Sequence, residues 1–298
     1  MLACAVVLSA RTALAGELIP AQFPDTSLFV NALRQVYAAP LPARVSGITV
    51  PHHLLATDVI ANTFARASNG SYDTIVLLSP DHFSLGVTDI SVSESGFSTA
   101  LGDIVPDTTI ARAMEQLSFV SPEHFFYREH GLQAETPFIR YYFPHARIVA
   151  FTFKETTPKT ELDAFIQALE PLLTGRTLVV QSTDFSHYLT KAAASGKDDQ
   201  TMRVINADDA DKVFSLNQPA NLDSIAAQYV QMRVQQDVFH ARPLIVEHGN
   251  SQDYTNEPVA QTTSYIAQAY VPDNAYASMR RFISWERVTR WLGLLKSR

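Results

Sequence analysis

Cysteine is scarce in this sequence, and its scarcity restricts the metal and redox chemistry that the chain can support. Cys4 is the one cysteine among 298 residues. A disulfide within the chain is therefore excluded, and no thiolate beyond residue 4 can act as a nucleophile or bind a metal. Any metal site in the body of the protein has to be built without thiolate ligands.

Long hydrophobic runs and a basic surface are also missing over most of the chain. No apolar run reaches the roughly 20 residues that a membrane-spanning helix needs. The composition, 46% apolar and 18% charged, is that of a globular rather than a disordered protein. Six basic residues and one acidic residue fall in residues 279–298, which leaves 17 basic and 29 acidic residues elsewhere. An acidic body excludes a nucleic-acid partner, because binding phosphates needs a clustered basic face.

The first residues resemble a secretory leader. Residues 1–15 hold an apolar stretch without acidic residues and end in Ala13-Leu14-Ala15, a small-residue pattern typical of a cleavage site. This pattern predicts an exported protein. No basic residue precedes the apolar stretch and Arg11 interrupts it, so a cytoplasmic protein with an apolar first helix is the alternative.

The last residues, 279–298, predict a basic amphipathic helix. Apolar side chains recur there at helical spacing on one face, while arginines occupy the others. Such a helix can lie on an anionic membrane surface, which would make a peripheral membrane contact. A helix packed on the protein's own core is the alternative. The apolar residues of this face are Trp285, Val288, Trp291, Leu292 and Leu295.

Short β-branched runs alternate with longer helical patterns between the two ends. This alternation predicts one three-layer α/β/α domain over residues 20–275, with a mixed, largely parallel sheet. The expected strands are Gly47–Val50, Thr74–Ser79, Thr88–Val92, Arg147–Phe153, Thr177–Ser182, Pro243–His248 and Ser264–Val271. The expected helices are Leu55–Ser68, Asp107–Leu117, Leu132–Tyr142, Thr160–Leu173, Asp209–Leu216 and Asn221–Gln235.

Four predicted strands each deliver a histidine at or just beyond their C-terminal ends. These are His52, His82, His187 and His248. In open α/β sheets this edge is where ligands bind, and neutral imidazole is the commonest side-chain metal ligand. The pattern predicts a metal site. His53 is expected to point away from His52, because neighbouring side chains alternate along an extended segment.

Five short motifs along the chain resemble those of one known family. They are Pro51-His52, Ser79-Pro80-Asp81-His82, Glu129-His130-Gly131-Leu132, Ser182-Thr183-Asp184-Phe185-Ser186-His187 and Gly249-Asn250-Ser251-Gln252-Asp253. Over residues 45–271 their order and spacing resemble the Memo family, component B of the AmmeMemoRadiSam group. The family's own motifs read approximately PHAGY, GPSHH, EHSIE, SSDFCH and a final Asn-x-x-Asp.

The resemblance implies a fold like that of the class III extradiol ring-cleaving dioxygenases, with a metal in a cleft at the sheet edge. Carried over motif by motif, the metal-site residues are His52 and His82, with Asp184 and His187 close by. The family's metal-site cysteine falls beside Gly249-Asn250, where this chain has His248. A histidine site suits Fe(II) or Zn(II) and disfavours Cu(I)–thiolate chemistry, although copper stays an option.

The resulting hypothesis is that His52, His82 and His248 bind one divalent metal in a cleft that accepts a small molecule or a peptide. Asp184 would orient His187 as acid or base. The neighbouring motif residues Asp81, Glu129 and His130 would complete the pocket. Glu135 or Glu247 could instead supply a carboxylate for Fe(II). Dioxygenase-like redox chemistry, metal-dependent hydrolysis and a non-catalytic metal- or peptide-binding module all remain open.

Overall fold

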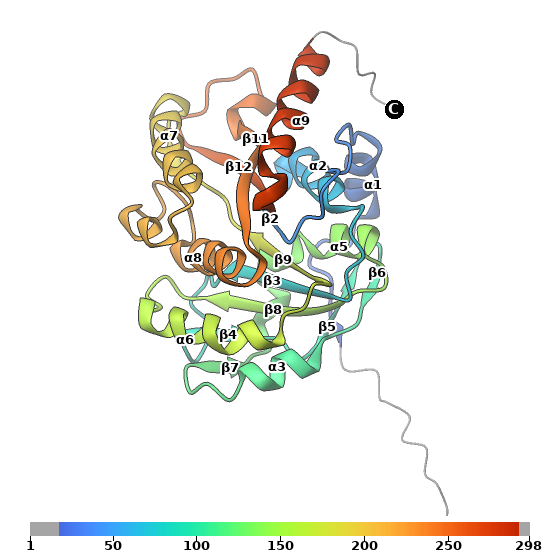
Figure 1. Cartoon of the computed structure of the whole chain (residues 1–298), viewed down its shortest axis with the longest axis vertical. Coiled ribbons are helices and arrows are strands. Elements are labelled where there is room, and N and C mark those ends of the chain that lie inside the picture. Colours follow the sequence, from blue (N-terminus) through green and yellow to red (C-terminus); the bar gives the residue numbers. More distant parts are fainter. Residues whose placement is uncertain (1–17, 292–298) are drawn as a thin grey trace, which may run out of the picture.

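A nine-stranded mixed sheet forms the middle layer of the molecule (Figure 1). The computed structural model describes residues 18–291, with side chains up to residue 287, so the predicted leader at residues 1–15 lies outside the described residues. The strand order is β10-β12-β2-β9-β3-β8-β4-β7, and β11 pairs with β12. The strands are β2 (Gly47–Val50), β3 (Thr74–Pro80), β4 (Ile90–Val92), β7 (Val120–Pro122), β8 (Arg147–Phe153), β9 (Thr177–Ser182), β10 (His187–Leu189), β11 (Ala241–Asn250) and β12 (Thr262–Pro272).

The expected three-layer α/β architecture is confirmed. The four central strands β2, β9, β3 and β8 run parallel, while β12 and β4 pair antiparallel at the two flanks. Strands β2, β8 and β9 have the predicted bounds. They were recognisable because strands covered on both faces are continuous apolar runs.

Helices cover both faces of the sheet. One face carries α1 (Thr26–Arg34), α2 (Thr57–Ala67), α5 (Thr136–Tyr142) and α9 (Asp273–Trp291). The other carries α3 (Thr108–Met114), α6 (Lys159–Leu169), α7 (Lys191–Ala207) and α8 (Ile225–Val234). None of the helices within residues 18–291 is long and apolar enough to cross a membrane.

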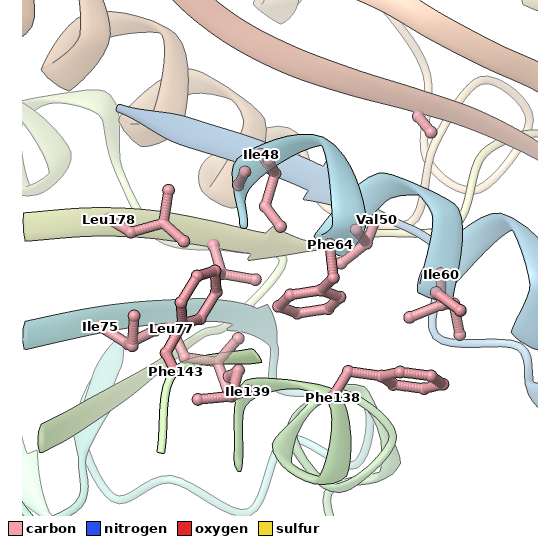
Figure 2. Close-up of a cluster of buried hydrophobic side chains, with 14 of the residues drawn as sticks. Ile48, Val50, Ile60, Phe64, Ile75, Leu77, Phe138, Ile139, Phe143 and Leu178 are labelled. Carbon is pink, nitrogen blue, oxygen red and sulfur yellow. The ribbon is translucent and has the colours of Figure 1, made fainter. Parts of the chain in front are cut away.

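Alternating strand residues feed two separate hydrophobic clusters. Ile75 and Leu77 of β3 pack in the cluster beneath α2 and α5, whereas Val76 of the same strand packs in the cluster beneath α6 and α8. Figure 2 shows the first cluster, where Phe64 of α2 and Phe138 of α5 lie with their rings stacked at a centroid distance of 5.9 Å. This packing holds the sheet edge that bears the histidines in a fixed position.

Several helical segments differ from the sequence-based expectations. The predicted helix Leu132–Tyr142 is divided into α4 and α5, and the predicted helix Asp209–Leu216 is a 3-10 helix over Ala210–Ser215. Helix α7 was not predicted, because it is polar, has little amphipathic pattern and carries Gly196 in its interior. The predicted helix Asn221–Gln235 starts late, at Ile225, with Ser224 as its cap. The residues before the cap therefore form a loop, and this loop contributes to the site.

Candidate metal centre

A cavity of about 830 Å³ opens at the carboxyl ends of the parallel strands. Among its lining residues are three imidazoles and two carboxylates that lie close together, those of His52, His82, His130, Asp184 and Asp223. The rest of the lining is polar in part, with His53, Asp81 and His187, and in part apolar or aromatic: Phe23, Leu54, Pro80, Phe83, Phe153, Tyr188 and Pro219. The cavity thus combines a compact polar cluster with a hydrophobic approach.

His52 follows β2 directly and is held by hydrogen bonds on two sides. Its Nδ1 lies 3.0 Å from Oγ of Ser182, at the end of the neighbouring parallel strand β9. The Ser182 hydroxyl in turn donates to the carbonyl of Gly131, 2.5 Å away. Because Nδ1 is engaged, Nε2 is the nitrogen that faces the cluster, 3.1 Å from Oδ2 of Asp223.

His82 follows β3 and is fixed by Glu129. The buried Glu129 carboxylate lies 2.6 Å from Nδ1 of His82 and also accepts the His82 backbone N–H. The same side chain caps α4 (His130–Gln133) by accepting from the Gly131 amide. Nε2 of His82 therefore faces the cluster and lies 3.6 Å from Oδ2 of Asp223. An imidazole held on its outer nitrogen by a carboxylate is the usual arrangement of a metal ligand.

Gly131 permits this close assembly. A Cβ atom at this position would lie 2.3 Å from Oγ of Ser79 and 3.2 Å from a ring carbon of His82. The short helix α4 can therefore approach the end of β3 closely enough to bring His130 beside His82, with ring centroids 4.0 Å apart.

Asp223 connects the two anchored imidazoles. Its Oδ2 accepts the backbone N–H of Asp184 at 3.1 Å and faces Nε2 of both His52 and His82. Its Oδ1 is buried and has no hydrogen-bond partner among the side chains that the structure describes. Two sets of side chains have ligand atoms within 4.8 Å of one another: His52, His82 and His130, and His52, Asp184 and Asp223.

The carboxylates control the charge of the imidazoles. Burial lowers the pKa of His52, but attraction to Asp184 and Asp223 outweighs burial, so the pKa of His52 is raised. For His82, burial is likewise outweighed by Asp223 and Glu129, which raise its pKa to about 10. Burial alone would raise the pKa of Asp223, yet the two imidazoles hold it below its ordinary range. Positive charge is thus strongly favoured at the centre of the cluster.

His130 is the exception among the three imidazoles. Burial lowers its pKa to about 4, and the charges of His52 and His82 act in the same direction. His130 is therefore neutral near pH 7 and has a lone pair available for a cation.

His187 and Asp184, predicted as an acid/base pair, both line the cavity but do not bond each other. The Asp184 carboxylate accepts the backbone N–H of His52 at 3.0 Å. Nδ1 of His187 is buried without a hydrogen-bond partner among the described side chains. His187 lies at an irregularity in the pairing of β10 with β12, and the next residue, Tyr188, has a left-handed φ of 59°. This bulge directs both aromatic rings toward the cavity.

The expectation that His53 turns away is wrong, because His53 also lines the cavity. The chain enters the 3-10 turn Leu54–Ala56 directly after His53, so strand alternation ends there. Its Nδ1 lies 2.8 Å from the hydroxyl of Tyr265. Burial lowers the pKa of His53, which keeps this imidazole neutral at pH 7.

His248 does not join the cluster, and this corrects the predicted third ligand. Its Nε2 lies 2.9 Å from Oδ2 of Asp198, a buried residue of α7. Strand β11 is separated from β2 by β12, which displaces its end by about 10 Å along the sheet. The side chain also faces α7 rather than the cavity. His130, expected only as a pocket residue, occupies the place beside His52 and His82.

The other two pocket residues have structural roles. Asp81 lines the cavity, but its carboxylate accepts the backbone N–H groups of Leu85 and Gly86 and so fixes the loop after β3. Glu129 positions His82, as described above.

Asp223 was not predicted as a site residue, because the sequence pattern placed it inside the predicted helix Asn221–Gln235. The signal that could have placed it in a loop was Ser224, a residue typical of a helix cap, directly after it.

Glu135 is buried near the site and gives a prediction about stability. Neither of its carboxylate oxygens has a hydrogen-bond partner among the described side chains. Burial, reinforced by the charge of Asp184, raises the pKa of Glu135 well above its ordinary value of 4.5. A raised pKa in the folded state gives stability that is complete below the unfolded pKa and is lost as the pH rises toward the folded pKa.

We therefore expect Glu135→Gln to gain stability relative to the wild type between pH 5 and pH 8. The gain should grow as the pH rises, because the wild-type carboxyl must either ionise while buried or stay protonated at a pH where the unfolded chain releases the proton. Urea unfolding of both metal-free proteins at the two pH values measures it. A difference that does not change with pH contradicts the prediction.

Comparisons with known proteins agree with the resemblance in the motifs. Residues 11–269 match the family model described as Memo-like protein. The chain is 31% identical over 185 residues to a MEMO1 family protein of Desulfurococcus amylolyticus, covering 59% of this chain and 65% of that protein. It is 25% identical to a MEMO1 family protein of Ignicoccus hospitalis, covering 72% of this chain and 79% of that protein. With several of these relatives, including that of Methanopyrus kandleri at 62%, the match spans less than two thirds of the relative's length.

A solved structure supports the fold. The crystal structure of an uncharacterized protein from Escherichia coli K12 superposes with a TM-score of 0.50 and 12% identity, covering 75% of this chain and 99% of that chain. At this identity the likeness concerns the fold alone.

Proposed function

Since this chain belongs to the family of Memo-like proteins, we propose that its histidine–carboxylate cluster binds one divalent transition metal for an oxidative, dioxygenase-like reaction on an apolar or aromatic small molecule. The observation that carries the proposal is the convergence of two anchored imidazoles on one carboxylate. Nε2 of His52 and Nε2 of His82 lie 3.1 Å and 3.6 Å from Oδ2 of Asp223. Two histidines and one carboxylate are the usual ligands of non-haem Fe(II), which makes Fe(II) the preferred metal ahead of Zn(II) and copper.

The residues present fit such an ion. Asp223 keeps a buried Oδ1 that has no hydrogen-bond partner within residues 18–291, and the cluster favours positive charge. His52 and His82 have their outer nitrogens engaged by Ser182 and Glu129, so their orientation is fixed before any ligand binds. When bound, the metal would supply Lewis acidity and open positions for substrate and dioxygen.

His187 is the acid/base group in this proposal. Its side chain lines the cavity, so its imidazole would take a proton from a bound hydroxyl group or return one. Tyr188, 67% exposed on the strained bulge, would contact the same ligand. The ligand class follows from the lining: Phe23, Phe83 and Phe153 surround the polar cluster and exclude water from an apolar or aromatic body.

Metal content and oxygen uptake test the proposal together. We expect stoichiometric metal in protein loaded with Fe(II) under anaerobic conditions, and oxygen consumption with catechols as the first probes. His187→Gln should keep its metal yet lose at least about 100-fold in turnover, the usual contribution of a positioned acid/base group.

Two other results would each reject the proposed reaction, and a third would reject the role of His187. Metal-loaded protein that turns over neither catechols nor simple esters would indicate a metal- or peptide-binding module. Cleavage of esters without oxygen uptake would indicate a hydrolase. His187→Gln with full turnover would remove His187 from the reaction.

A further inference from the structure

Helix α9 separates its charges in an unusual way. The described side chains of this helix include one glutamate, Glu286, and it is 5% exposed. Its Oε2 lies 2.5 Å from Nη2 of Arg66, and its Oε1 accepts the backbone N–H of Ala39. Apart from Asp273 at its first position, the exposed surface of α9 up to residue 287 therefore carries no carboxylate.

The exposed surface of α9 is cationic. Arg280, Arg281 and Arg287 are all exposed, while Met279 and Ile283 pack on the core. Trp285 is 61% exposed and, at helical spacing, lies beside Arg281. The helix is thus packed on its own protein through Met279 and Ile283, and it presents arginine and tryptophan to solvent.

A groove of about 580 Å³ lies between this helix, α7 and β11. Three guanidinium groups line it, those of Arg242, Arg280 and Arg287. Arg242 is neutralised by Asp208 and Asp273, whose oxygens lie 3.3 Å and 3.9 Å from its Nε. We call this space the arginine groove.

The excess charge of the arginine groove comes from Arg280 and Arg287. Nη2 of Arg287 donates to the carbonyls of Ile245 and Val246, which orient the guanidinium without neutralising it. Planar guanidinium groups are suited to phosphate oxygens, which they bind through paired hydrogen bonds. The body of the protein outside residues 279–298 is acidic, so an anionic partner would be repelled elsewhere and attracted here.

We propose that α9 holds the protein on an anionic membrane surface, with a lipid phosphate in the arginine groove between Arg280 and Arg287 and Trp285 at the lipid–water interface. Tryptophan prefers that interface, and basic amphipathic helices bind there through charge and apolar contact together. Figure 1 shows α9 at one end of the molecule, beside β11. This proposal is independent of the metal site.

Sedimentation of the full chain with vesicles tests the proposal. Binding is expected to vesicles of phosphatidylcholine mixed with phosphatidylglycerol, to be absent with phosphatidylcholine alone, and to weaken as salt is raised. Each arginine near an anionic surface contributes about 1 kcal/mol, so Arg280→Gln/Arg287→Gln should bind about 30-fold more weakly. Arg281→Gln, which keeps the Arg287 hydrogen bonds, should bind about 5-fold more weakly.

Arg203→Gln is the matched control, since Arg203 is exposed on α7 and does not line the groove. It should bind like the wild type. Equal loss in Arg203→Gln, or equal binding to neutral vesicles, overturns the proposal. Binding of soluble pyrophosphate without vesicle binding would assign the groove to a free phosphate compound. Self-association that Trp285→Ala abolishes, without vesicle binding, would assign the surface to a second copy of the chain.

Discussion

Replacement of Asp223 by asparagine is expected to lower the affinity for the divalent metal by more than about 100-fold, beyond the 10–100-fold that loss of an outer hydrogen-bond partner costs. Asparagine has the shape of aspartate and can still accept the backbone N–H of Asp184, but it lacks the negative charge that faces His52 and His82. Equilibrium titration of the metal-free protein, with metal content measured after dialysis, checks this expectation.

Two histidine variants provide the comparison for Asp223→Asn. His52→Ala should lose the metal to a similar extent, because His52 belongs to both groups of candidate ligands. His248→Ala should keep its metal, because its imidazole bonds Asp198 outside the cavity. Unchanged affinity in Asp223→Asn, or lost affinity in His248→Ala, would place the metal away from the cluster described here.

Breaking the buried ion pair between Arg66 and Glu286 is expected to cost about 3–5 kcal/mol of unfolding free energy. The two side chains are 3% and 5% exposed, so removal of either one takes the ion-pair partner from a buried charge. Arg66→Met and Glu286→Gln should each show this loss in urea unfolding followed by circular dichroism.

The double variant Arg66→Met/Glu286→Leu distinguishes an ion pair from simple packing. It replaces both charges by apolar groups and should recover most of the lost stability, since buried pairs are often no better than hydrophobic substitutes. A loss below about 1 kcal/mol in the single variants, as for exposed pairs, would contradict the assigned burial. Additive losses in the double variant would contradict the pairing itself.

The sheet and three of the five cluster residues could be predicted from the sequence. Strands β2, β3 and β9 are continuous apolar runs, and polar residues directly beyond parallel strands must meet at one edge, which is why His52, His82 and Asp184 were found. The expected place of His248 was wrong because strand order and side-chain face are tertiary properties. Nothing local to residues 243–248 reveals that β12 lies between β11 and β2.

Asp223 and α7 show a second limit of prediction from sequence. A hydrophobic pattern locates helix interiors better than helix starts, so Asp223 was assigned to a helix that begins two residues later. Helix α7 buries few apolar side chains and is anchored partly by polar contacts, such as those of Asp198 with Ser186 and Ser264. Such contacts have no sequence period and become visible in the folded chain.

The cluster gathers its members from five separate stretches of chain, beyond β2, beyond β3, at the start of α4, beyond β9 and ahead of α8. An unfolded chain cannot bring those stretches together, so an ion that occupies the cluster binds the native state alone. By thermodynamic linkage, the occupied protein resists heat and denaturant in proportion to the logarithm of free metal concentration. The free metal concentration would then determine both the activity of the protein and its resistance to unfolding.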